Sequence, residues 1–140
     1  MTGSKVRIRV RYPEVDGMGV VHHSHYPVWF EVGRTELMRE LGEPYAALES
    51  SGLYMPVVEM GARYREPIGY DEEVEVETRI ERVGGASVRF AYRVAKIAGG
   101  TLAADGFTVH AAVDRGGSPV RMPPGLREKL RAACEQGGAR

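Results

Sequence analysis

The chain has 140 residues, and its 19 lysines and arginines balance 19 aspartates and glutamates to a formal net charge of +0. This length suits a single domain with a sizeable core, and a hydrophobic content of 43% excludes a disordered chain. The balanced charge argues against broad electrostatic binding of nucleic acid or of an anionic membrane.

No apolar run is long enough to span a bilayer, and the N-terminus lacks the apolar core of a signal peptide. A lone cysteine, Cys134, cannot form a disulfide within the chain, so nothing indicates an oxidising compartment. We therefore expect a cytoplasmic protein. No repeat, low-complexity run or linker divides the chain, so residues 1–140 are expected to form one domain.

Alternating apolar and basic residues predict a first strand over 5–11. A glycine-containing loop, 12–25, follows it. Apolar residues at three- and four-residue spacing then predict a helix over 26–41, with Ser24 as a candidate N-cap and Gly42 as a natural stop.

Gly33 falls in the middle of this helix, where glycine costs roughly 1 kcal/mol relative to alanine. We expect its reason to be a close approach of the helix to a strand. Further along the chain, residues 44–52 predict a short second helix, and residues 53–64 predict a strand that contains Pro56 near its start.

The clearest strand pattern lies over 73–80 and is followed by a second over 88–94, with glycines between them. A three-residue turn pairs Ile80 with Phe90, Thr78 with Tyr92 and Glu77 with Arg93, and also sets Glu81 opposite Arg89. A two-residue turn would mix buried and exposed faces. The longer turn, with a bulge, is therefore predicted.

Another alternating strand is expected where Phe107, Val109, Ala111 and Val113 share one face, and the two prolines at 123 and 124 open a C-terminal helix. The order of elements predicts an α+β domain with one central helix packed on a curved antiparallel sheet. One helix is unable to cover such a sheet fully, and the end strands leave open edges. Association into dimers or larger oligomers would hide both.

The most informative stretch is the loop before the long helix. Asp16 lies between a strand and glycine residues, and His23 follows seven residues later, where the helical pattern begins. The N–H groups of a helix N-terminus bind developing negative charge, and a carboxylate with an imidazole can supply a base or nucleophile and a proton partner. This combination indicates acyl-transfer chemistry. The alternative is a loop aspartate that bonds its own backbone beside Gly17.

The same stretch, Tyr12-Pro-Glu-Val-Asp16-Gly-Met-Gly-Val-Val-His-His23-Ser-His-Tyr26, together with the order of elements, resembles the hotdog-fold acyl-CoA thioesterases. The similarity is greatest to the 4-hydroxybenzoyl-CoA thioesterase-like group that includes the Tol–Pal-associated enzymes. It implies a hotdog fold, in which a curved five-stranded antiparallel sheet wraps a long central helix. It also implies a homodimer or homotetramer with sites at subunit interfaces.

The resemblance assigns the catalytic carboxylate to Asp16, the histidine to His23 and an assisting tyrosine to Tyr12. One departure is His22, where many relatives have tyrosine. A second is the turn at 84–86, which lacks the basic residues that aroyl-CoA relatives place there. Contacts between CoA phosphates and Arg82 or Arg121 are therefore a separate hypothesis, based on the match of guanidinium groups to phosphate, and the alternative is ordinary surface charge.

The chemistry needs few groups, because a CoA thiolate leaves with a pKa near the free-thiol value of about 8.5. Backbone N–H groups near His23 and Ser24 are expected to polarise the thioester oxygen. Asp16 then acts as nucleophile or as general base on water, and the residues do not separate these roles. Trp29 or Phe30 is expected to border the acyl pocket, and Glu31 either caps the cleft or faces solvent.

The function predicted from these residues is hydrolysis of a small or medium acyl-CoA, aliphatic or aromatic, to a free acid and CoA. No metal and no bound cofactor are expected, because His22, His23 and His25 do not match a familiar ligand spacing. An acyl carrier protein is an alternative carrier of the acyl group. The rival function is a non-catalytic acyl-CoA or acyl-carrier binding module, and a hotdog dehydratase fits less well.

Overall fold

The computed structural model describes residues 3–138 and contains one sheet with three α-helices. In chain order the elements are β1 (Ser4–Arg9), the 3-10 turns η1 (Tyr12–Glu14) and η2 (His23–His25), α1 (Tyr26–Glu40), α2 (Tyr45–Ser50), β2 (Val57–Tyr64), β3 (Glu73–Val83), β4 (Ser87–Lys96), β5 (Leu102–Ala111) and α3 (Pro124–Gly138). No helix among these residues is long and apolar enough to cross a membrane.

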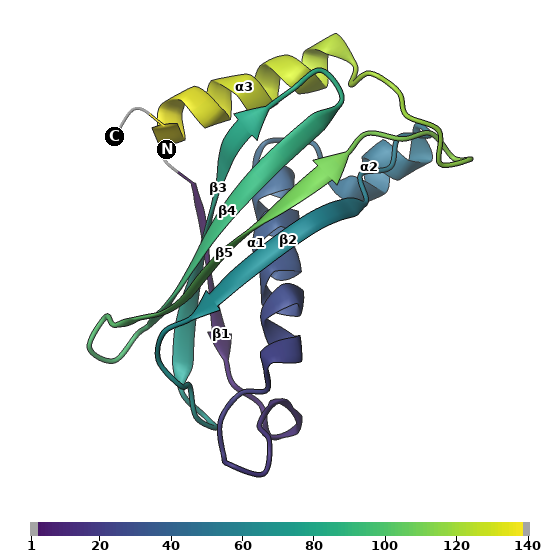
Figure 1. Cartoon of the computed structure of the whole chain (residues 1–140). Coiled ribbons are helices and arrows are strands. Elements are labelled where there is room, and N and C mark those ends of the chain that lie inside the picture. Colours follow the sequence, from purple (N-terminus) through teal and green to yellow (C-terminus); the bar gives the residue numbers. More distant parts are fainter. Residues whose placement is uncertain (1–2, 139–140) are drawn as a thin grey trace.

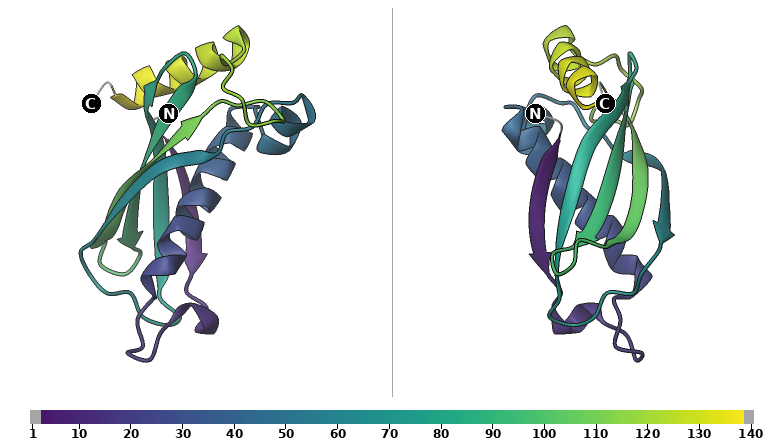
Figure 2. Two further views of the ribbon diagram at one scale, coloured as in Figure 1. Left: turned by 45° about the vertical axis from the view of Figure 1, so that its right-hand side comes forward. Right: turned by 90° about the vertical axis from the view of Figure 1, so that its left-hand side faces the viewer.

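The five strands form one antiparallel sheet in the order β1-β3-β4-β5-β2. Figure 1 shows α1 crossing one face of the sheet, and Figure 2 shows the sheet curving around it. Helix α3 packs on β3, at the end of the sheet that carries the β3–β4 hairpin (Figure 1). This is the hotdog arrangement expected from the sequence.

The register of β3 against β4 confirms the predicted pairing of Ile80 with Phe90 and of Glu77 with Arg93. The strand ends leave a three-residue turn over 84–86, also as predicted. The bulge lies in β3, where Glu81 is the extra residue and Arg82 stands opposite Arg89. The Glu81 carboxylate nevertheless accepts a hydrogen bond from Arg89 Nε at 2.6 Å, so the predicted ion pair forms across the bulge.

Gly33 has the role that its position in mid-helix predicted. A Cβ atom added there would overlap Thr78 Oγ1 on β3 and lie 3.1 Å from Val76 Cγ1. The absence of a side chain therefore lets α1 lie directly on the middle of the sheet. This close approach fixes the height of the helix over the core residues Phe30, Leu37 and Met38, which are all buried.

Four local predictions need correction. Strand β1 ends at Arg9 rather than at residue 11, because the chain turns into η1 at Tyr12. Strand β2 begins at Val57 rather than at 53, and an isolated bridge between Tyr54 and Val113 precedes it. Ser24 is not the N-cap of α1: that position is His25, which makes no side-chain cap bond, because the 3-10 turn η2 leads directly into the helix.

The fourth correction concerns β5, which begins at Leu102 and faces the opposite way from the prediction. Thr108, His110 and the following Ala112 are buried beneath α1, whereas Phe107 and Val109 lie half-buried on the outer face. The apolar alternation was assigned to the core face because the two inward polar residues were not expected to be satisfied there. The structure satisfies them with a chain of hydrogen bonds.

Candidate active site

Asp16 begins a tight turn over residues 16–20 at the open end of the molecule. Its N–H donates to the Val20 carbonyl at 2.8 Å, and its carbonyl accepts from the Gly19 N–H at 2.9 Å. The side-chain Oδ1 accepts from the Met18 N–H at 2.8 Å and more weakly from the Val20 N–H at 3.4 Å. Among the described residues Oδ2 has no hydrogen-bond donor, so half of this carboxylate shapes the turn and half remains available.

Glu14, two residues earlier, is the carboxylate that sequence reasoning missed. It is 3% exposed and accepts hydrogen bonds from the Arg11 N–H at 2.7 Å and from the Trp29 indole N–H at 3.3 Å. Burial acts to raise the pKa of Glu14, but the hydrogen bonds from Arg11 and Trp29 and the Arg11 charge outweigh it and hold the pKa below its usual value. Glu14 therefore fastens the loop to α1 as a buried anion.

The segment that enters α1 presents its backbone N–H groups toward the open end of the molecule. The Ser24 N–H donates to His22 Nδ1 at 3.3 Å, and the same nitrogen lies 2.9 Å from the Ser24 hydroxyl. The His23 N–H has no acceptor among the hydrogen bonds of residues 3–138. Of the two N–H groups expected to polarise a thioester oxygen, that of His23 is thus the one left unpaired.

The two remaining residues of the predicted catalytic set are exposed at this same end. The His23 ring stacks against that of His22, with centroids 4.2 Å apart. Tyr12 is 76% exposed and meets Tyr70 edge to face at 5.8 Å. The Val15–Val21 bridge closes the loop that carries Asp16 and brings it beside the residues that lead into η2. The structure therefore gathers Tyr12, Asp16, His23 and Ser24 at one end of the sheet.

The other predicted contact residues are not gathered there. Trp29 is 2% exposed and packs in the core above Glu14, whereas Glu31 lies on the exposed side of α1. Arg82 and Arg121 are exposed at the hairpin end, where Arg121 lies beside Gly85. At about 3.3 Å per residue, β3 alone separates its start from Arg82 by about 30 Å. One chain therefore does not bring the two arginines next to Asp16.

The structure also reveals a buried polar chain between α1 and the sheet. His110 Nδ1 lies 2.9 Å from the Met55 carbonyl, which can only accept, so Nδ1 carries the proton. His110 Nε2 then accepts from Thr108 Oγ1 at 2.9 Å, and Tyr92 OH donates to Thr108 at 2.5 Å. Burial, opposed by the Met55 bond and reinforced by the Arg34 charge, lowers the pKa of His110 to about 4. A Thr-x-His pair at strand spacing was the available signal.

Comparison with known proteins identifies the family. Residues 10–130 match the thioesterase-like superfamily. The chain is 40% identical to YneP of Bacillus subtilis strain 168 over 112 residues, covering 80% of each protein, and 31% identical to the acyl-CoA thioester hydrolase YbgC of Escherichia coli O157:H7 over 117 residues, covering 84% of each. It superimposes on the DHNA-CoA thioesterase of Staphylococcus aureus with a TM-score of 0.92 at 30% identity, over 100% of this chain and 97% of that one.

The chain belongs to the thioesterase-like superfamily. It is accordingly an enzyme, a hydrolase of thioesters with the hotdog fold, as the sequence predicted. Among the described residues no group of three or more His, Cys, Asp or Glu side chains is placed to hold a metal ion. The available groups at the open end are the carboxylate of Asp16, the imidazole of His23 and the backbone N–H of His23.

Proposed function

We propose that this thioesterase hydrolyses a small or medium acyl-CoA, aliphatic or aromatic, to the free acid and CoA, with Asp16 as the catalytic carboxylate. The observation that carries the proposal is the division of labour within Asp16: Oδ1 is held by the Met18 N–H at 2.8 Å, while Oδ2 has no donor among the described residues. A carboxylate whose orientation is fixed by one oxygen and whose other oxygen is open suits attack on a carbonyl or activation of water.

Two routes use this geometry. In the first, Oδ2 accepts a proton from water as the water oxygen attacks the thioester carbon; in the second, Oδ2 attacks that carbon itself and forms a mixed anhydride, which water then hydrolyses. In both, the His23 N–H stabilises the negative carbonyl oxygen, the C–S bond breaks and CoA leaves as a thiolate. The His23 imidazole orients the substrate or returns a proton to it, and the exposed hydroxyl of Tyr12 assists.

Ser24 and the exposed Glu31 border the acyl group in this proposal, and the buried Trp29 backs its pocket from the core side. Neither a metal nor a bound cofactor takes part, and CoA is itself part of the substrate. An acyl carrier protein could present the acyl group in place of CoA, since both end in the same thioester. The acyl-CoA assignment follows the names of YbgC and of the Staphylococcus aureus enzyme, the second of which acts on an aromatic acyl-CoA.

The separation of Asp16 from Arg82 and Arg121 supports a homodimer, or a homotetramer built from it. Strand β2 is an open edge, and together with α1 it exposes a set of apolar side chains: Val28, Val32, Val57, Val58, Met60 and Tyr64. Antiparallel pairing of two β2 edges would bury this set. It would also bring the hairpin end of one copy to the same end of the pair as the Asp16 turn of the other. Arg82 and Arg121 are then proposed to contact CoA phosphates from the second subunit.

The experiment is a thiol-release assay with purified protein on short, long and aromatic acyl-CoAs. We expect Asp16→Asn to lower kcat about 1,000-fold, because the amide keeps the Oδ1 acceptor but loses basicity and nucleophilicity. Asp114→Asn is the matched control: Asp114 Oδ1 accepts from the Gly116 N–H at 3.0 Å and the Ser118 N–H at 2.9 Å, in a turn of the same shape. This variant should keep wild-type activity.

Equal activity of Asp16→Asn and wild type would refute the catalytic assignment. Saturable binding of acyl-CoA with no thiol release by wild type across the whole panel would instead favour the non-catalytic binding module. Far-UV circular dichroism on each variant establishes that the losses do not come from unfolding.

A further inference from the structure

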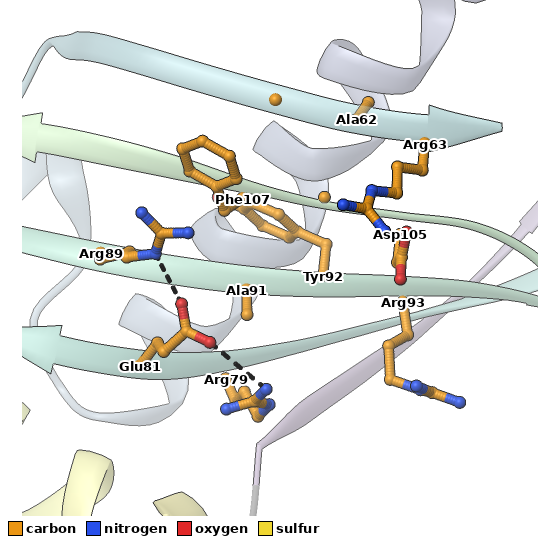
Figure 3. Close-up of a pocket in the computed structure, with 12 residues that line it drawn as sticks. Ala62, Arg63, Arg79, Glu81, Arg89, Ala91, Tyr92, Arg93, Asp105 and Phe107 are labelled. Atoms are coloured by element: carbon orange, nitrogen blue, oxygen red, sulfur yellow. Dashed lines mark hydrogen bonds and ion pairs between the residues drawn. The ribbon is translucent and has the colours of Figure 1, made fainter.

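The outer face of the sheet, turned away from α1, carries a hollow of about 470 Å³ around Ala91 (Figure 3). The register explains it, because Ala91 and Phe107 stand side by side in a row that ends at Gly61. Phe107 lies over Gly61, where any Cβ atom would meet its ring. Short side chains thus form the floor, and long charged side chains on the neighbouring rows form the walls.

The walls carry more positive than negative charge, although the chain as a whole is neutral. Four arginines and two carboxylates line the hollow: Arg63, Arg79, Arg89, Arg93, Glu81 and Asp105. Glu81 pairs with Arg89 at 2.6 Å and with Arg79 at 3.6 Å, so one carboxylate serves two guanidinium groups (Figure 3). Asp105 pairs at 3.0 Å with Arg65, which is not among the lining residues.

Guanidinium capacity is therefore left over on both sides of Ala91. Arg93 has only a loose contact to Glu77 at 3.8 Å, and Arg63 has no ion-pair partner within 4.0 Å among the described residues. The guanidinium of Arg89 lies over the Phe107 ring at 3.9 Å, which fixes its plane while it keeps a single bond to Glu81. Each arginine can still donate to an added anion.

A second feature of this face points to an anion. The bulge at Glu81 sets Arg82 directly opposite Arg89, and like charges in that position destabilise a strand pair. An adjoining hollow is lined by these two arginines and Glu81. A bound dianion would replace this repulsion by attraction.

We propose that the hollow around Ala91 binds an organic phosphate, a small molecule that carries at least two phosphoryl groups such as a nucleoside diphosphate. Guanidinium forks match phosphoryl oxygens bidentately, and arginines on both sides of the floor suit two linked phosphates. This site is independent of Asp16 and of the proposed acyl-transfer chemistry, since it lies on the face of the sheet opposite α1.

The test is isothermal titration calorimetry of the full chain with inorganic pyrophosphate and with ADP. Wild type is expected to bind both, and affinity should fall at least tenfold in Ala91→Leu, which fills the floor, and in Arg89→Gln. Ala95→Leu is the matched control, because Ala95 lies on the same strand and face but outside the hollow. It should bind like wild type.

Absence of binding to wild type, or undiminished binding to Ala91→Leu, would overturn the site. Light scattering after gel filtration supplies a second check: a lower mass for Ala91→Leu than for wild type would show that a second copy of the chain covers this face, and would also overturn it. Given binding, displacement of ADP by coenzyme A in the Asp16→Asn variant identifies the nucleotide end of CoA as one source of the phosphates. Failure of CoA to displace ADP identifies a free nucleotide.

Discussion

The turns at 16–20 and 114–118 have the same hydrogen bonds but different surroundings. In each, the first N–H donates to the fifth carbonyl, at 2.8 and 2.9 Å, and the fourth N–H donates to the first carbonyl, at 2.9 Å in both. In each, the aspartate Oδ1 accepts from the third and fifth N–H groups. The fourth residue is a glycine with positive φ, 78° in the first turn and 86° in the second.

This comparison separates structure from function at Asp16. The side-chain bonds of Asp16 are those of an ordinary turn, so they confirm the alternative in which the aspartate bonds its own backbone, as far as Oδ1 is concerned. What the second turn lacks is the sequel: η2 and α1 begin within a few residues of Asp16, whereas Asp114 is followed by an extended segment toward α3. The catalytic proposal therefore depends on the neighbours of the carboxylate and not on its turn.

Each turn also follows a buried ionisable residue that anchors it. Glu14 lies two residues before Asp16 and is held as an anion by Arg11 and Trp29. His110 lies four residues before Asp114 and is held neutral between Met55 and Thr108. The anchors differ in charge, so pH and substitution should act on them differently.

The largest expected effect on stability concerns His110, whose pKa in the folded chain is about 4 against about 6.5 for a free histidine. Below pH 6.5 the unfolded chain takes up a proton that the folded chain refuses. The stabilisation is therefore complete above pH 6.5 and is lost as the pH falls toward 4, by about 3 kcal/mol in all. Urea unfolding at pH 7 and pH 5 should already show a loss of about 2 kcal/mol.

His110→Gln supplies the control for this prediction, because glutamine does not titrate. The variant is expected to be less stable than wild type at pH 7 but to lose less stability between pH 7 and pH 5. Identical slopes for the two proteins would show that His110 is not the titrating group.

His110 also marks what the sequence could and could not predict. Alternation predicted the β3–β4 register, because apolar and charged residues there separate cleanly onto two faces. In β5 both faces carry apolar residues, and alternation then favoured the wrong one. The inward face holds Thr108 and His110, whose burial depends on partners from Met55 and Tyr92, at 55 and 16 residues of separation along the chain. No local pattern contains that information.

The candidate site shows the same limit. The loop motif predicted that Tyr12, Asp16 and His23 would lie together, since all three fall within a few residues of the start of α1. It did not predict Glu14, because a buried carboxylate is identified by its partners and not by its neighbours in sequence. Nor did it predict that Arg82 and Arg121 lie at the other end of the sheet, since only the direction and length of β3 determine that separation.

The second prediction removes the anchor of the first turn. In Glu14→Gln the amide N–H₂ replaces an acceptor that faces the Arg11 and Trp29 donors, so buried donors lose their partner at a cost of about 2 kcal/mol. Thermal unfolding measures the loss, with the exposed Glu49→Gln on α2 as a control that should stay within about 0.5 kcal/mol of wild type. An unchanged melting temperature for Glu14→Gln would mean that the loop does not need this anchor.

The smallest expected effects compare the two turns directly. Gly19→Ala and Gly117→Ala each place a Cβ atom in open space but at positive φ, so each should cost about 1 kcal/mol from backbone strain alone. Gly125→Ala in α3 also meets no neighbour, and it should stabilise the helix by up to about 1 kcal/mol. Equal losses in the two turns would confirm that they are structurally equivalent. Thiol release then distinguishes them: it should fall in Gly19→Ala, where strain moves Asp16 Oδ2, and stay at the wild-type rate in Gly117→Ala, because only the first turn holds its carboxylate beside the start of a helix.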